Sequence, residues 1–294
     1  MNEIIDMHAH VTQNTLRGLH TTDATPAALK RLASAAGIGQ VVVLATKFPY
    51  KRSGVSAQFL LKQTRGDSFF TVFGTMDMTQ DTLDEDLDIL SALLRERRIS
   101  GIKLYPGYQR FSLSDVRTYP VYEIARMYDV PVMVHGGELH SCCPRQETDR
   151  KDGVFRCGYA ECPLVRDAFL AAPSQILPAA QAFPDVTFII AHMGNPLFEE
   201  LRFVMARCQN VHTDTSGQIV SGSPESKDSR VREWIANNML QVIRLPHGVD
   251  RVLFGSDFPI QSYEDSIGFI DRLPLTSSEK DRILFQNAQT ILHL

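Results

Sequence analysis

Residues 4–10 of the chain are Ile-Ile-Asp-Met-His-Ala-His, a short apolar run that becomes polar at its end. Similar runs recur along the chain, and most are rich in Val, Ile and Phe, as strands covered on both faces are. The predicted strands are Ile4–His10, Val41–Thr46, Phe69–Thr75, Gly101–Tyr105, Val132–His135, Val186–His192, Val211–Thr215 and Val252–Asp257.

Helix-like segments separate these strands. One opens at Thr25-Pro26, with Thr25 as N-cap and Pro26 at the first helical position, and runs to about Ala36. Another, from Asp81 to Arg98, is acidic at its start and basic at its end, which matches the helix dipole. The other predicted helices are Val116–Asp129, Pro173–Phe183, Leu197–Cys208, Glu225–Arg244 and Ser277–Leu294.

Eight strand–helix units predict an α/β protein, a closed (β/α)8 TIM barrel that forms a single domain over residues 1–294. The length of 294 residues is near the size of one such barrel, roughly 250 residues. The alternative is an open doubly wound sheet. No GxGxxG motif follows the first strand to support it.

Composition and charge exclude several classes of function. The net charge of −4 gives no basic surface for nucleic acid and no polybasic patch for a membrane. No apolar run approaches the roughly 20 residues that span a bilayer. The N-terminus lacks the basic and apolar regions of a signal peptide, so we expect a cytoplasmic protein.

The first predicted strand carries a His-x-His pair. Alternate side chains of a strand share one face, so we expect Asp6, His8 and His10 to point one way and the apolar residues between them the other. Two imidazoles about 7 Å apart on one strand face can hold a metal ion. Alone, the pair is equally well a polar strand end that happens to hold two histidines.

Three other predicted strands end in a side chain that can bind metal. His135 and His192 each follow an apolar run, and Asp257 ends the last strand. The carboxyl ends of barrel strands meet at one mouth, where barrel enzymes place their chemistry. Neutral imidazoles and carboxylates are ligands of Zn²⁺, so we expect these residues to form a metal site with the His-x-His pair.

Lys103 lies in the middle of the apolar strand Gly101–Tyr105, where lysine is unusual. Its side chain can extend along the strand to reach water at the barrel mouth. Alternatively it is a carboxylated lysine that bridges two metals, because burial among cations lowers the pKa of the amine and frees it to add CO2.

The complete set of strand residues resembles the amidohydrolase superfamily, with its first-strand His-x-His, fourth-strand Lys, fifth- and sixth-strand His and eighth-strand Asp. The KLYP motif within Gly101–Pro106 is similar to the fourth strand of dihydroorotases. Ala191–Gly194, Gly255–Pro259 and Ile283–Ala288 resemble the amidohydrolase-2 branch, which contains decarboxylases, lactonases and hydratases.

The resemblance implies one or two divalent metals, Zn²⁺ or else Mn²⁺ or Fe²⁺. Carboxylated Lys103 would bridge the two ions of a binuclear centre. Asp257 would take a proton from a metal-activated water, and in single-metal relatives His192 would act on substrate or water. The implied metal ligands are His8, His10, Lys103, His135, His192 and Asp257.

Loops that follow the strands are expected to shape the substrate pocket. Lys51 and Arg52 in the second loop would suit a carboxylate, or else form a solvated loop. Tyr105 and Tyr108 follow the fourth strand and are further candidates for substrate contact. The insertion at about 136–173 is expected to form a lid over the mouth.

The lid segment also contains a cluster of cysteines. Their spacing is not that of a standard Cys-x2-Cys pair, so two interpretations stay open: a structural zinc site, or an ordinary insertion with chance cysteines. The candidate ligands are Cys142, Cys143, Cys157 and Cys162.

These observations predict an enzyme, a metal-dependent hydrolase that acts on a C–N or C–O bond of a small, carboxylate-bearing molecule. The alternative is a zinc-dependent decarboxylase or hydratase that uses the same ligands. A non-catalytic metal-binding barrel is a third hypothesis, and it requires a site closed by protein ligands. Barrels of this kind often dimerise, so a homodimer is also expected.

Overall fold

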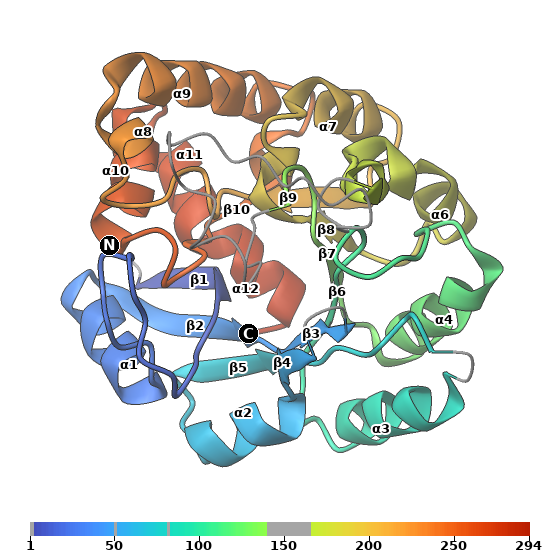
Figure 1. The fold of residues 1–294 in the computed structure, drawn as a ribbon. Coiled ribbons are helices and arrows are strands. Elements are labelled where there is room, and N and C mark those ends of the chain that lie inside the picture. The colour runs from blue at the N-terminus through green and yellow to red at the C-terminus, as the bar shows by residue number, and fades with distance from the viewer. Residues whose placement is uncertain (1–2, 50–51, 81–82, 140–165) are drawn as a thin grey trace.

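The computed structural model describes residues 3–49, 52–80, 83–139 and 166–294. Within these ranges, parallel strands form the frame of the molecule (Figure 1). They are β1 (Ile4–Ala9), β2 (Ile38–Leu44), β5 (Phe70–Phe73), β6 (Ile102–Leu104), β7 (Val132–Val134), β8 (Phe188–Ile190), β9 (Val211–Asp214) and β10 (Val252–Leu253).

The strands close into a ring. Hydrogen bonds order them as β1-β2-β5 and as β10-β9-β8-β7-β6. A parallel bridge between Gly74 and Ile102 joins β5 to β6. On the other side the backbone N–H of Met7 donates to the carbonyl of Phe254 at 2.9 Å, so β1 meets the end of β10. The eight-stranded parallel barrel expected from the sequence is therefore confirmed.

Helices surround the ring, as Figure 1 shows. The segments expected to be helical are confirmed, and Thr25 caps α1 by accepting from the backbone N–H of Ala28. Two helices, α2 and α10, were not expected, nor was the antiparallel hairpin of β3 (Thr46–Phe48) and β4 (Ser53–Val55). The helices are α1 (Pro26–Ala35), α2 (Ala57–Thr64), α3 (Asp84–Arg95), α4 (Tyr119–Tyr128), α6 (Leu177–Ala182), α7 (Phe198–Met205), α8 (Pro224–Lys227), α9 (Ser229–Ile243), α10 (Tyr263–Arg272), α11 (Ser277–Asp281) and α12 (Asn287–Leu292).

The strands separate two apolar cores. Val41 and Val43 of β2 pack outward with residues of α1, while Val42 and Leu44 point into the barrel. The inner cluster, which fills the barrel, consists of Ile5, Met7, Val42, Leu44, Phe73, Met133, Ile189, Ala191, Leu253, Ala288 and Leu292.

The strict alternation expected for β1 is wrong beyond Met7. Ile5 and Met7 belong to the inner cluster, but Ala9 packs in the outer core. The register of β1 against β2 shifts between Ile4 and Ile5 and again between Asp6 and Ala9. Irregularities of this kind redirect side chains near active sites.

The last helix, α12, closes the end of the barrel where the strands begin. It lies in the middle of the ring in Figure 1, and its residues Ala288 and Leu292 belong to the inner cluster. The side-chain amide of Asn287 donates to the carbonyls of Val249 and Val252, each at 2.7 Å, at the start of β10. The opposite end, where the strands finish, is not covered by α12 and can hold an active site.

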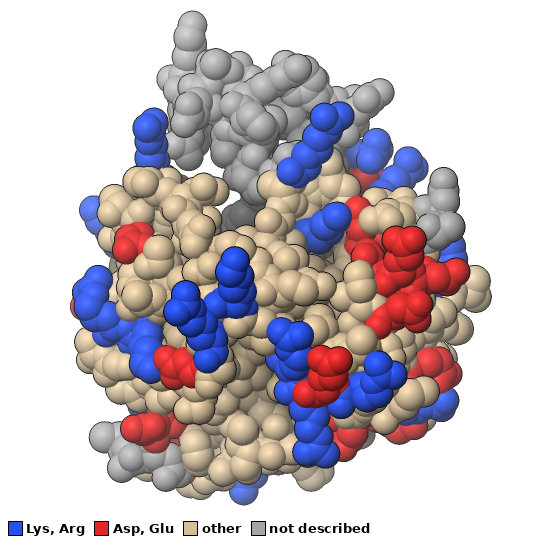
Figure 2. All heavy atoms as spheres, turned by 90° about the horizontal axis from the view of Figure 1, so that it is seen from below, with Lys and Arg blue, Asp and Glu red and all other residues tan. Residues whose placement is uncertain are grey.

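The surface carries both charges. Figure 2 shows one face on which Lys and Arg side chains are interspersed with Asp and Glu, as the small net charge of −4 suggests. Among the described residues, no helix has the length and apolar character needed to cross a membrane.

Replacing Asn287 with Ala tests how the closing helix is anchored. We expect the free energy of unfolding to fall by about 1–3 kcal/mol, because two buried carbonyls lose their donor. Urea denaturation followed by circular dichroism measures the change. Thr290→Ala, on an exposed position of the same helix, is the control and should change stability by less than about 0.5 kcal/mol. Equal stability of the two variants would contradict this anchoring role.

Candidate metal centre at the barrel mouth

Three predicted ligands meet where the barrel closes. His8 and His10 come from the end of β1, and Asp257 follows β10. The Oδ1 atom of Asp257 lies 3.5 Å from Nε2 of His8 and 3.3 Å from Nε2 of His10. One ligand atom from each of the three residues lies within 4.8 Å of the others, which is a spacing that one metal ion can bridge.

Barrel closure itself brings these residues together. The backbone N–H of Asp257 donates to the carbonyl of His8 at 2.7 Å, and that of His10 donates to the carbonyl of Phe258, also at 2.7 Å. Asp257 and His192 both have left-handed backbone conformations, with φ of 58° and 61°. Such conformations are strained for residues with a side chain and often mark functional sites.

Asp214 orients the ring of His8. Its Oδ2 atom lies 2.8 Å from Nδ1 of His8, and the hydroxyl of Ser216 lies 3.0 Å from the same nitrogen. A proton on Nδ1 then points to the carboxylate, which leaves the lone pair of Nε2 for a ligand. Nε2 of His8 is buried and has no hydrogen-bond partner among the described residues. This unsatisfied nitrogen fits a bound divalent metal.

His192 and His135 contact each other beside this group. Nε2 of His192 lies 3.2 Å from Nδ1 of His135, and the hydroxyl of Ser216 lies 2.9 Å from Nδ1 of His192. Nε2 of His135 lies 3.1 Å from the carbonyl of Glu138. His192 also forms a compact group with His8 and Asp214, whereas His135 belongs to neither compact group found in the described residues.

The ionisation of these residues suits metal binding. Burial opposes charge on Asp257, but a hydrogen bond from His10 and the nearby imidazoles hold its pKa well below the usual range. Burial, helped by the charge of His8, lowers the pKa of His192 to about 3. The carboxylate is therefore ionised and that imidazole neutral at physiological pH, which are the forms that bind divalent metals.

Lys103 lies deep in the same mouth. Its side chain is fully buried, and its Nζ atom has no hydrogen-bond partner among the described residues. Burial lowers the pKa of this amine to about 8. Nζ lies 5.4 Å from the centre of the Tyr105 ring, and the Tyr105 hydroxyl donates to the carbonyl of Ala45 at 2.7 Å.

The remaining substrate candidates lie around this mouth or outside the described residues. Tyr108 stacks edge-on against His135, with 4.8 Å between ring centres, and it is buried like Tyr105. Arg52 is exposed beside the β3–β4 hairpin. Their roles in substrate binding stay predictions. Lys51, the zinc-site candidates Cys142, Cys143, Cys157 and Cys162, and most of the expected lid lie outside the described residues.

Asp214 is not among the metal-site residues predicted from the sequence. A signal was present, because the predicted strand Val211–Thr215 carries a carboxylate near its end, just as His135 and His192 stand at the ends of their strands. The same argument about strand ends would have placed Asp214 at the mouth.

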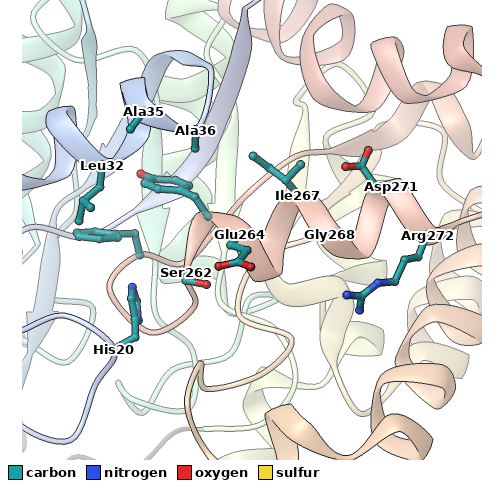
Figure 3. Close-up of a pocket in the computed structure, with 12 residues that line it drawn as sticks. His20, Leu32, Ala35, Ala36, Ser262, Glu264, Ile267, Gly268, Asp271 and Arg272 are labelled. Carbon is teal, nitrogen blue, oxygen red and sulfur yellow. The ribbon is translucent and has the colours of Figure 1, made fainter.

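A hollow of about 630 Å³ lies outside the barrel mouth, between α1 and α10 (Figure 3). Leu32 and Ala35 of α1 face Ile267 and Gly268 of α10 across it, and His20 lies at its edge. His20, Glu264 and Asp271 also line it, but they belong to no metal-binding group found among the described residues.

Comparison with known families identifies the chain. The family model described as Amidohydrolase, that of the amidohydrolase-2 family, matches residues 5–294. The protein belongs to the amidohydrolase family. This membership confirms the predicted family and the prediction that the protein is an enzyme. No curated relative matches the chain in sequence.

Solved structures resemble this amidohydrolase over its whole length. An uncharacterized TIM-barrel protein of Bordetella bronchiseptica has a TM-score of 0.74 and 18% identity, covering 99% of this chain and 98% of that one. A dihydroxybenzoic acid decarboxylase from Polaromonas sp. JS666, with bound manganese and the inhibitor 2-nitroresorcinol, has a TM-score of 0.67 and 14% identity, covering 100% and 98%. An amidohydrolase from Burkholderia multivorans with bound zinc has a TM-score of 0.66 and 16% identity, covering 100% of both chains. These likenesses confirm the fold.

Replacing Asp214 with Asn tests its orienting role. We expect the zinc affinity to fall by about 10- to 100-fold, because the amide no longer holds the protonated Nδ1 of His8 as the carboxylate does. Competition with a metal-binding dye measures the affinity. Asp77→Asn, at a buried carboxylate in the third loop, is the control and should bind zinc as the wild type does. Equal affinities in the two variants would show that Asp214 does not position the ligand.

Proposed function

We propose that this amidohydrolase is a metal-dependent hydrolase that cleaves a C–N or C–O bond of a small molecule. The observation that carries the proposal is the group of His8, His10 and Asp257 at the barrel mouth. Three protein ligands leave a position for water or substrate, as catalytic zinc sites do. A barrel that only stores metal would close that position with a fourth protein ligand.

The residues present fit one divalent ion, with zinc as the first choice. Imidazole nitrogens and a carboxylate are ligands that Zn²⁺ takes, and Nε2 of His8 has no other partner among the described residues. When bound, a divalent ion supplies Lewis-acid chemistry and lowers the pKa of water toward neutrality.

Side chains of the protein would transfer the proton, hold substrate or water, and orient the ligand. Oδ1 of Asp257 faces the two imidazoles, so Oδ2 is the oxygen that would take a proton and pass it to the leaving group. Neutral His192, beside His8, would hold substrate or water through Nε2 in place of its contact with His135, while Ser216 keeps its contact with Nδ1. Asp214 would keep the ring of His8 in place throughout.

A metal-dependent decarboxylase is the second candidate function. The group of His8, His10 and Asp257, which includes no lysine, favours it, because a centre with one metal does not need a bridging lysine. The barrel is also similar to that of a dihydroxybenzoic acid decarboxylase, although this likeness is one of fold. The two candidates use the same ligands and differ in the bond that breaks.

Metal analysis of the purified protein tests the metal centre that both candidate functions require. We expect one equivalent of zinc per chain, and we expect His10→Ala to lose at least about 100-fold in zinc affinity, because it removes a direct ligand. Elemental analysis and dye competition measure both. His20→Ala, at an exposed histidine outside the centre, is the control and should keep its zinc. A wild-type protein that binds no metal would refute the proposal.

Activity assays separate the two candidate functions. We expect the zinc-loaded protein to open lactones or cyclic amides, a chelator to abolish this activity, and added zinc to restore it. Hydrolysis is followed by proton release, and hydroxybenzoates are tested in parallel for release of CO2. Release of CO2 without any hydrolysis would favour the decarboxylase over the hydrolase.

A further inference from the structure

We propose that Lys103 stays an unmodified ammonium and binds a carboxylate of the substrate beside the metal centre. The inference rests on the proposed function, because it names the class of molecule that the same site takes. It assigns the recognition of that carboxylate to a buried lysine of the barrel and not to the cationic second loop.

The first argument is the burial of a cation that lacks its own partner. The side chain of Lys103 is 0% exposed, and its Nζ atom makes no hydrogen bond or ion pair with any described residue. Such an ammonium has lost contact with water without gaining a hydrogen-bond acceptor, and this desolvation costs free energy of folding. An anionic group that enters the mouth would relieve this cost, so the site favours anions.

The second argument is that the neighbouring carboxylates are already engaged. Asp214 accepts from the backbone N–H groups of His192 and Ser216, at 2.9 and 3.0 Å, and also contacts His8. Asp257 lies between the rings of its two histidine neighbours. Neither comes within 4.0 Å of the Lys103 ammonium, so the missing counter-ion has to arrive with the ligand.

The third argument is the direction of the side chain. Lys103 is in register with Met133 of the neighbouring strand, and Met133 belongs to the inner cluster, so both side chains enter the barrel. The Tyr105 ring stands 5.4 Å from Nζ, and its hydroxyl is held by the carbonyl of Ala45. This fixed ring borders one side of the ammonium, and the charges of Asp214 and Asp257, which raise the pKa of Lys103 against the effect of burial, place the amine near the metal centre.

A carboxylated Lys103 that bridges two metals is the competing interpretation. That arrangement needs a second set of ligands from His135 and His192. Nε2 of His192 lies 3.2 Å from Nδ1 of His135, a spacing that one ion could bridge, but no group of three ligands among the described residues includes His135. The geometry therefore favours a single metal with a free ammonium beside it.

Benzoate and benzamide test the assignment, because they have nearly the same shape and differ in charge. Calorimetry measures their binding to the zinc-loaded wild type and to Lys103→Met, which keeps the length of the side chain without its charge. We expect benzoate to bind the variant about 10-fold more weakly or worse, with benzamide unchanged. Lys103→Arg, which keeps the charge, should recover part of the loss.

Four results would overturn the assignment. Benzoate that binds both proteins equally, or that does not bind the wild type at all, would show that Lys103 has no such role. Loss of a zinc equivalent in Lys103→Met would make the lysine a metal ligand. A carbamate signal in the ¹³C NMR spectrum of the wild type in labelled bicarbonate would show that the lysine is carboxylated. This measurement does not depend on the folding of a variant. Zinc content of the wild type reports separately on the proposed function.

Discussion

The hydrogen bonds that join β1 to the segment after β10 are the constraint on which the rest of the site depends. They pair His8 with Asp257 and His10 with Phe258 along the backbone, although about 250 positions separate these residues in the sequence. Without this closure the two histidines would lie at the open edge of a sheet. With it, a carboxylate stands beside both rings at the one end of the barrel that α12 leaves open.

Closure also determines the electrostatics, because it buries the charged groups together. Burial alone would neutralise Asp214, but its contact with His8 outweighs that effect and holds its pKa well below the usual range. The same burial keeps His192 neutral. Each residue thus depends on its neighbours for the protonation state in which it can work, and Lys103 is the member of the group that has no partner among the described residues.

Much of the fold and part of the site could be predicted from the sequence, because both follow from the strands. Each apolar run became a barrel strand, and His8, His10 and Asp257 met as expected. The side-chain directions of β1 could not be predicted, since register shifts depend on the neighbouring strand. His135 and His192 end neighbouring strands and meet at the mouth as expected, but the orientation of their rings depends on side-chain packing that the sequence does not show.

The position of α12 has a consequence for how the protein is made. This helix contains residues 287–292, so the end of the barrel that it seals stays open until these residues have left the ribosome. The first strand must likewise wait for β10 before its edge is covered. A nascent chain therefore holds His8 and His10 without Asp257, and the complete ligand set appears only after about 250 further residues have been made.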